Sequence, residues 1–222
     1  MSGLTKSSIA RKVTMALSGL FLVFFLAQHF TINITSVIAP DTFNEWSHFM
    51  GYNPLVQYVL QPILIAGVII HFVMGFVLEI RNNSARKIKY AQYRGQANSP
   101  WVSRNMIITG SVVLAFIGLH MYDFWVHEMA YKYIAGNPED PTRYYKETVE
   151  KFEPFWRTAI YVVSFILLSL HLLHGFASSF QTMGVNNIYT PSIQKFTKFF
   201  AIAIPLGFIF IAIYHHLNPI TH

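Results

Sequence analysis

The sequence contains no cysteine and very little charge. Only 12% of its 222 residues are charged, against about a quarter in an ordinary globular domain. The absence of cysteine excludes disulfides, cysteine-held iron–sulfur clusters, covalently attached c-type haem and thiol nucleophiles. Hydrophobic residues make up 53% of the chain, with 20 Phe and 12 Tyr among them. This balance is typical of a membrane protein, and any redox chemistry in it must use cofactors held by histidine.

Five apolar stretches are long enough to cross a bilayer as helices, which takes roughly 20 residues. They cover about residues 13–33, 55–80, 105–126, 158–180 and 196–217. We therefore expect an all-α membrane protein, a single domain over residues 1–222, with the first four helices forming a bundle. Pro62 and Pro205 are expected to kink the second and fifth spans. The longest loop, residues 127–157, includes a helix-compatible stretch at 143–153. We identify no internal repeat.

Basic residues gather on one side of these spans. Most of the 16 Lys and Arg lie at the N-terminus, between the second and third spans, and between the fourth and fifth, whereas nearly all of the acids lie on the other side. Because cytoplasmic loops carry an excess of Lys and Arg, the pattern predicts a cytoplasmic N-terminus and an external C-terminus. A signal peptide also begins with positive charge, but no small-residue cleavage site follows the first span. We therefore expect that span to be a membrane helix.

Histidines within the spans are the main functional signal, because an ionisable side chain in the hydrocarbon region is costly. Each of the first four spans carries one at a matched depth: His29, His71, His120 and His171. His29 and His120 follow basic residues by 17 and 16 positions, so both lie roughly 25 Å from the cytoplasmic boundary. His71 and His171 precede their own boundary by 10 positions, which is roughly 15 Å. Two pairs at two depths predict two stacked haems, each held by two axial imidazoles.

Small residues near these histidines would let a porphyrin pass between the helices. Two of them follow a histidine by four positions and share its helix face, and a third precedes His120. These haem-pocket candidates are Gly75, Gly175 and Gly118. The fourth span also contains His174, but its depth of roughly 10 Å matches His71 less well. We therefore predict that His171 is the ligand and that His174 is a polar neighbour.

Two other interpretations of the histidines remain open. They could be separate core histidines that bond to neighbouring backbone, or they could line a metal transporter. A transporter needs carboxylates or clustered ligands near the midplane, whereas the predicted spans place Glu79 and Asp123 near helix ends. His215 and His216 end the fifth span and are expected to be interfacial.

Several short motifs together resemble one family. They are Gln28-His29, Ile70-His71 with Gly75, Leu119-His120, His171 with Gly175, Gly184 and Pro191, and in the first outer loop Phe43-Asn44, His48-Phe49-Met50 and Pro54. With these motifs the chain resembles, over roughly residues 10–200, the di-haem cytochrome b membrane anchor of bacterial succinate dehydrogenase and fumarate reductase. The anchor type is the single-subunit, five-helix form. Two features differ from that family: the loop 127–157 is longer, and Gly51 stands where some members have a carboxylate.

The resemblance implies the electron-transfer subunit of a succinate:quinone oxidoreductase, respiratory complex II of the tricarboxylic acid cycle, in the bacterial cytoplasmic membrane. Two b haems would carry electrons between an iron–sulfur subunit on the cytoplasmic side, near residues 1–12 and 81–104, and a membrane quinone, menaquinone or ubiquinone. An FAD-containing flavoprotein subunit would interconvert succinate and fumarate. This chain has no Gly-rich dinucleotide fingerprint and is not expected to act on succinate itself or to bind nucleic acid. Another di-haem, quinone-linked b-type membrane cytochrome is the closest alternative.

A quinone needs a polar pocket at the membrane edge. We expect it on the outer side, beside the His29 and His120 haem, where the candidates are Glu45, Trp46, His48, Tyr122, Asp123 and His127. On the cytoplasmic side, Ser18, Lys12, Trp101 and Arg104 offer an alternative pocket or partners for the haem propionates.

Overall fold

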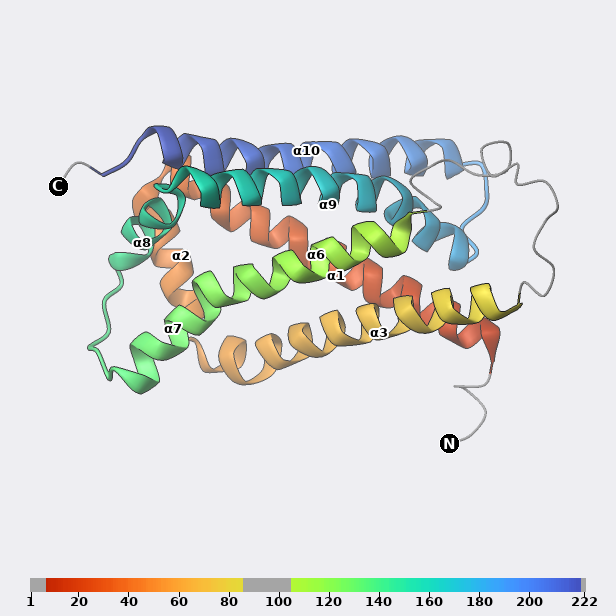
Figure 1. Ribbon diagram of the computed structural model, residues 1–222, viewed down its shortest axis with the longest axis horizontal. Coiled ribbons are helices and arrows are strands. Elements are labelled where there is room, and N and C mark those ends of the chain that lie inside the picture. The colour runs from red at the N-terminus through yellow and green to blue at the C-terminus, as the bar shows by residue number, and fades with distance from the viewer. Residues whose placement is uncertain (1–6, 86–104, 221–222) are drawn as a thin grey trace.

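The computed structural model describes residues 7–85 and 105–220, and within these ranges the chain is helical with no strand (Figure 1). The long helices are α1 (Ser8–Ile38), α3 (Gln61–Ala85), α6 (Met106–His120), α9 (Phe155–Thr182) and α10 (Thr190–Leu217). The shorter helices are α2 (Pro40–Tyr52), α7 (His127–Met129) and α8 (Arg143–Phe152), and π-helical turns occupy Val56–Leu60, Met121–Val126 and Ala130–Ile134. Trp101 and Arg104 lie outside the described residues.

Five helical stretches are long and apolar enough to cross a membrane, which confirms an all-α, multi-pass membrane protein. They are Ser8–Ile38, Val56–Asn82, Met106–Ile134, Phe155–Thr182 and Thr190–Leu217. Each extends beyond the apolar stretch that predicted it, because backbone hydrogen bonding continues into flanking residues of moderate polarity.

The third stretch differs most from the prediction. It runs to Ile134 instead of ending near 126, since π-helical turns carry the helix through Met121–Val126 and Ala130–Ile134. The region 127–157 is therefore largely helical and not a long loop. The short helix predicted at 143–153 is confirmed as α8. In the first outer loop an unpredicted helix, α2, begins with Pro40 in its first turn followed by Asp41, both of which favour a helix start.

The two prolines act differently. Pro205 lies inside α10, fully buried, and the helix continues through it. Pro62 lies two residues after the end of the π-helical turn Val56–Leu60, in which the backbone N–H of Gln61 bonds to the carbonyl of Val56. A proline cannot supply the next backbone donor, so the wider turn lies where the regular ladder is interrupted.

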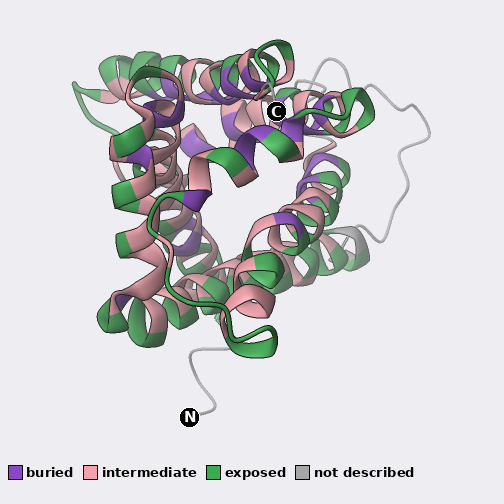
Figure 2. Ribbon diagram, turned by 90° about the vertical axis from the view of Figure 1, so that its left-hand side faces the viewer, coloured by how far each residue is buried: buried purple, intermediate pink, exposed green. Residues whose placement is uncertain are grey.

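Helices α1, α3, α6 and α9 form a ring in which each packs against its two neighbours (Figure 2). Helix α10 lies outside the ring against α9 and α1. The chain therefore has an N-terminal end, where α1 begins, and a C-terminal end, where α10 finishes beside α2 and α8 (Figure 1). The four spans that carry the candidate histidines are the four members of the ring.

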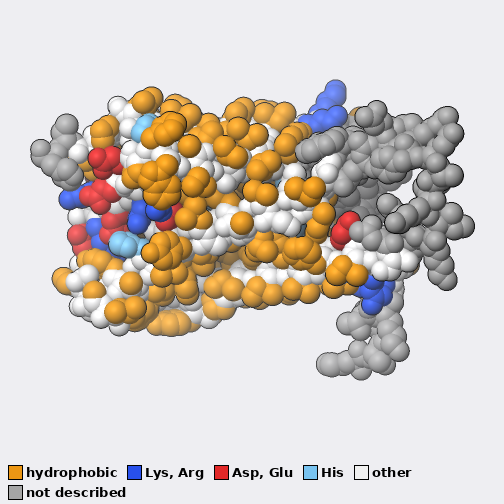
Figure 3. Space-filling view, viewed as in Figure 1, with side chains coloured by type: hydrophobic (Ala, Val, Ile, Leu, Met, Phe, Trp, Pro, Cys, Tyr) orange, Lys and Arg blue, Asp and Glu red, His pale blue; other side chains and the backbone are white. Residues whose placement is uncertain are grey.

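The best-packed core lies in the half of the bundle towards the C-terminal end. Its buried members come from α8, α9 and α10: Phe152, Tyr161, Phe165, Phe208, Ile211 and Ala212. Partly buried residues of α1 and α6 complete it. On the face drawn in Figure 3, apolar side chains cover the middle of the bundle, acidic and basic side chains gather at the C-terminal end, and a few more lie at the opposite end. This distribution suits a protein with a lipid-facing middle and a polar end.

Candidate functional site

The four candidate histidines meet in two pairs across the ring. His71 of α3 faces His171 of α9, with ring centres 6.3 Å apart and ring planes at 77°. His29 of α1 faces His120 of α6, with ring centres 5.7 Å apart and planes at 85°. The first pair lies towards the N-terminal end and the second towards the C-terminal end. These are the pairs that matched depth predicts.

The spacing of each pair suits a shared metal ion. A metal–nitrogen bond is about 2 Å long, and the centre of an imidazole ring lies about 1 Å beyond its bound nitrogen. Two imidazoles on opposite sides of one metal ion therefore have ring centres about 6 Å apart. The described residues hold no group of three or more His, Asp or Glu that could bind a bare ion. A metal held by only two histidines needs its other ligands from elsewhere, as a porphyrin provides.

The N-terminal pair is held by two hydroxyls from the other two helices of the ring. Ser18 Oγ of α1 lies 3.2 Å from His71 Nδ1, and Thr109 Oγ1 of α6 lies 3.4 Å from His171 Nδ1. In each helix the hydroxyl-bearing residue is followed by a glycine, and the imidazole ring packs against that glycine. A Cβ atom on Gly19 would lie 3.3 Å from His71 Cε1, and one on Gly110 would lie 3.5 Å from His171 Cε1. Small residues thus bring the hydroxyl-bearing helices close to both imidazoles.

The C-terminal pair has a different, aromatic environment. Phe25 stacks on His29 with ring centres 5.4 Å apart, and Phe116 and Phe124 lie 5.9 and 5.1 Å from His120. His120 Nδ1 is buried and has no hydrogen-bond partner within the described structure. An unpartnered buried nitrogen is costly, so a ligand or water at this pair would remove a penalty.

The predicted pocket glycines flank the pairs and do not touch them. Gly75 and Gly175 face methionine methyl groups, Met15 Cε at 3.7 Å and Met106 Cε at 3.5 Å from the built Cβ positions. A Cβ on Gly118 would meet no atom of the described structure within 4 Å, so there is open space beside His120. His174 forms no ring contact with His71 among the described residues, whereas His171 does. The role of all these residues around a haem stays a prediction.

The two glycines that contact histidines, Gly19 and Gly110, end two similar short motifs. Helix α1 contains Met-Ala-Leu-Ser-Gly from Met15, and α6 contains Met-Ile-Ile-Thr-Gly from Met106. In both helices the next histidine of the site comes ten residues after the glycine. In α3 and α9 the other histidine comes four residues before a glycine. This shared spacing was not predicted, because it is carried by only a few separated positions.

A buried ion pair lies next to the C-terminal histidine pair. Asp123 is 1% exposed, forms an ion pair with Arg157 of α9, and accepts a hydrogen bond of 2.8 Å from the Tyr161 hydroxyl. The Tyr161 ring is 6.2 Å from that of His120. Asp123 lies within a continuous helical stretch, so the expectation that it is near a helix end is wrong.

The six quinone candidates do not form one cluster. Glu45 and Trp46 are exposed on α2, Tyr122 is 66% exposed, and Asp123 is buried in its ion pair. His48 Nε2 lies 2.7 Å from Glu139, and His127 Nε2 lies 4.0 Å from Glu147. No hydrogen bond, ion pair or ring contact joins any two of the six within the described ranges. They surround the C-terminal end at several separate places.

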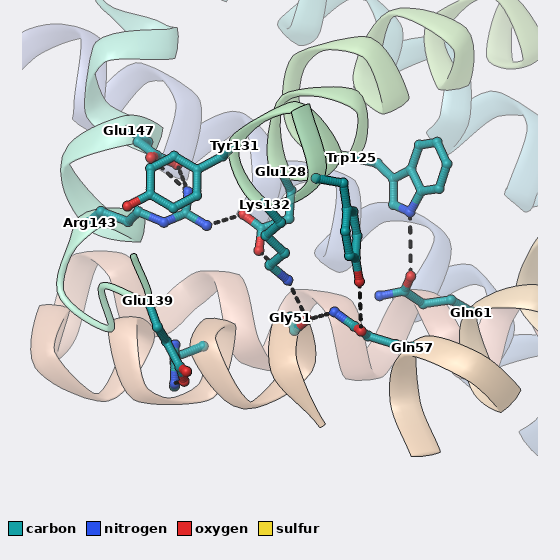
Figure 4. A network of polar contacts seen from close by, with 12 residues as sticks. Gly51, Gln57, Gln61, Trp125, Glu128, Tyr131, Lys132, Glu139, Arg143 and Glu147 are labelled. Atoms are coloured by element: carbon teal, nitrogen blue, oxygen red, sulfur yellow. Dashed lines mark hydrogen bonds and ion pairs between the residues drawn. The ribbon is translucent and has the colours of Figure 1, made fainter. Parts of the chain in front are cut away.

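A polar network that the sequence did not reveal lies at this end (Figure 4). Glu128 pairs with Lys132 at 2.6 Å and with Arg143, which also bonds to Glu147 at 2.7 and 2.8 Å. Burial of Arg143 disfavours its charge, but hydrogen bonds to Glu147 and Glu128 outweigh this and raise its pKa. The network therefore holds α8 against the end of the third span by charge-assisted bonds.

Gly51 lies at the centre of this network. Its carbonyl accepts hydrogen bonds from Lys132 and Gln57, and a Cβ atom on it would lie 3.0 Å from Glu128 Oε1 and 3.2 Å from the Tyr144 hydroxyl. Burial and the nearby Glu128 raise the pKa of Tyr144. Glu128 thus places a carboxylate directly beside Gly51.

Two hollows open on the surface of the bundle. One of about 320 Å³ at the C-terminal end is lined by Tyr52, Gln57, Tyr58, Lys132, Tyr133, Asn137 and Glu139. One of about 330 Å³ at the N-terminal end is lined by Ile9, Lys12, Val13, Ser178, Gln181 and Thr182. Among the predicted residues, Lys12 lines the second hollow, and His48 adjoins the first through Glu139.

His215, which was expected to be interfacial, is buried inside the protein. It is 0% exposed, its Nε2 lies 2.8 Å from Ser36 Oγ, and the rings of Tyr145 and Phe152 pack around it. His216, in contrast, is half-buried against the backbone carbonyls of Phe152 and Glu153. Helix α8 packs over the end of α10 and buries His215. The sequence of the last span alone does not predict this packing.

Comparison of the chain with protein-family models, curated proteins and solved structures finds no match.

Proposed function

We propose that the chain is the membrane-anchor cytochrome b of a succinate:quinone oxidoreductase and binds two b haems. The observation that carries the proposal is the pairing of His71 with His171 and of His29 with His120, at two levels of one four-helix ring. A haem held by one of these histidine pairs would supply electron transfer and not substrate activation. A metal transporter fits less well, because each pair offers only two protein ligands.

The chain's own residues would hold these groups in a fixed place. The helices of the ring supply one imidazole each, and the spacing along α1 and α6 sets the distance between the two levels. The residues that contact His71 and His171 precede His29 and His120 by ten or eleven positions, which is a rise of about 15 Å. The separation is larger than the roughly 10 Å that the boundary residues alone suggest.

The same proposal includes the partner subunits and the orientation of the chain in the membrane. An iron–sulfur subunit and its FAD-containing flavoprotein would dock at the N-terminal end, on the cytoplasmic side of a bacterial membrane. A quinone would react at the C-terminal end, where the hollow beside His48 offers the donors Lys132, Gln57 and Tyr133. Quinone carbonyls need such donors at a membrane edge. The resemblance of the motifs supports the identity of the partners, and the histidine geometry supports the haems.

The test is a reduced-minus-oxidised visible spectrum of the full-length chain, purified from membranes, with haem quantified per chain. We expect two b haems. H71A and H171A should each remove one haem, and H29A and H120A should each remove the other. H174A is the matched control, one turn along α9 from His171, and should retain both. A wild-type chain without haem, or loss of a haem in H174A but not in H171A, would contradict the proposal.

A further inference from the structure

The two hydroxyls beside the N-terminal histidine pair have their protons already engaged. Ser18 Oγ donates to the carbonyl of Met15 at 3.0 Å, and Thr109 Oγ1 donates to the carbonyl of Met106 at 3.0 Å. A hydroxyl has one proton and two lone pairs. Towards the histidine, each oxygen is therefore left only as an acceptor.

With the hydroxyl protons on these carbonyls, the proton of each imidazole is expected on Nδ1. If the hydroxyl oxygen accepts, then Nδ1 of His71 and of His171 must carry the hydrogen that it donates. A neutral imidazole with its proton on Nδ1 presents a bare lone pair on Nε2, which is the form that binds a metal. Both rings are thus prepared in the same tautomer by the same local arrangement, once in α1 and once in α6.

The C-terminal pair lacks this arrangement. Asn33 Nδ2 lies 3.4 Å from His29 Nδ1 but donates to the His29 carbonyl at 2.8 Å, and its amide nitrogen has no lone pair with which to accept an imidazole proton. His120 Nδ1 has no partner in the described part of the chain. The four histidines therefore divide into two whose ring protons have hydroxyl acceptors and two whose ring protons do not.

We propose that Ser18 and Thr109 are positioning residues that accept the Nδ1 protons of His71 and His171, and so orient both rings and tune the haem between them. The proposal rests on the proposed function and extends it to residues that are not ligands. An accepted Nδ1 proton makes the imidazole a stronger electron donor, which favours ferric over ferrous iron. Removing the acceptors should raise the midpoint potential of this haem only.

The variants are S18A, T109V and the double variant in the full-length chain, with redox titration of both haems. A tenfold loss of preference for the ferric state corresponds to a rise of about 59 mV in a one-electron couple. Loss of such partners also weakens metal binding by about 10- to 100-fold, so release of this one haem is an equally supportive result. S18T and T109S keep the hydroxyl and should restore the wild-type potential.

Matched controls are available on the same two helices. Thr14 and Ser111 are exposed, and within the described ranges their hydroxyls bond to the carbonyls of Ala10 and Ile107 and to no histidine. T14V and S111A should leave both potentials unchanged. Two bound haems with wild-type potentials in the double variant would overturn the role of Ser18 and Thr109 and leave the proposed function standing. A wild-type chain that binds no haem would overturn the proposed function itself.

Discussion

Asp123 shows how much a single buried charge can matter in this chain. Its carboxylate is balanced by Arg157 and the Tyr161 hydroxyl, in a region where the side chain has almost no contact with solvent. A buried ion pair adds little net stability, but removing one partner leaves an uncompensated charge. Asp123 also follows His120 by only three residues, so the pair contributes to the electrostatic field at the C-terminal histidines.

We predict that R157Q destabilises the protein by about 3–5 kcal/mol, because it leaves the charge of Asp123 buried without a counter-ion. The free energy of unfolding would be measured by circular dichroism in detergent micelles with added denaturant. The double variant D123N/R157Q removes both charges and should recover much of the loss. Lys146, in an exposed pair with Glu150 at 3.8 Å, is the control, and K146Q should change stability by less than about 1 kcal/mol. Equal losses in R157Q and K146Q would contradict the prediction.

Individual residues also show what the sequence could and could not predict. The pairing of His71 with His171, in preference to His174, followed from residue counts, since a regular helix converts position into depth. Ser18 and Thr109 were not assigned to the histidines, because their role depends on which helix lies beside which. His215 was misjudged for the same reason: its burial is created by α8, a separate element.

At the scale of elements, the helices that lie outside the apolar spans shape the C-terminal end. Helix α8 is held by the charge network around Arg143, and α2 by packing against α1 and α8. Hydropathy does not indicate either of these contacts. The sequence therefore predicted the membrane spans well, but it predicted poorly how α2 and α8 pack at the C-terminal end. The extension of the third span to Ile134 is a further case, because π-helical turns continue a helix beyond its apolar segment.

The turn at Asp140–Thr142, just before α8, should become less stable at acidic pH. Asp140 accepts hydrogen bonds from the Thr142 backbone N–H at 2.8 Å and from its hydroxyl at 2.7 Å. The backbone bond first, and then the hydroxyl bond, lower the pKa of Asp140 below its usual 3.8. A carboxyl whose pKa is lower in the folded state stabilises it fully above the unfolded-state pKa, and this stabilisation disappears as the pH falls through the folded-state value.

We therefore expect the Thr142 amide to lose protection against hydrogen exchange below the usual pKa of an aspartate, after correction for the intrinsic exchange rate. In D140A the amide should be weakly protected at neutral pH and should show no further change on acidification. E150Q, on the exposed side of α8, should behave as the wild type. An unchanged Thr142 protection factor in D140A would mean that the turn is held by other contacts.

At the scale of the whole molecule, the four-helix ring is organised as two similar halves. Helices α1 and α3 form one half and α6 and α9 the other, and each half gives one histidine to each pair. The N-terminal pair takes its histidines from the second helix of each half and its hydroxyls from the first, whereas the C-terminal pair takes its histidines from the first helices. If both pairs hold haems as proposed, the two haems would provide a path for electrons from one end of the bundle to the other.

The last prediction concerns the end at which a quinone reacts. His48 adjoins the C-terminal hollow, its Nε2 is paired with Glu139, and its Nδ1 is buried without a partner in the described structure. If a quinone binds there as proposed, the His48 ring would exchange protons with the quinol. Losing a general acid or base typically lowers a rate by about 100-fold or more. We expect H48Q, in membranes containing the whole complex, to lower quinone-linked succinate oxidation by about that factor. Oxidation coupled to a water-soluble dye and both haem spectra should persist, and E150Q should be fully active. If H48Q retains quinone turnover while K12Q loses it, the quinone reacts at the N-terminal hollow and two stacked haems are not needed to reach it.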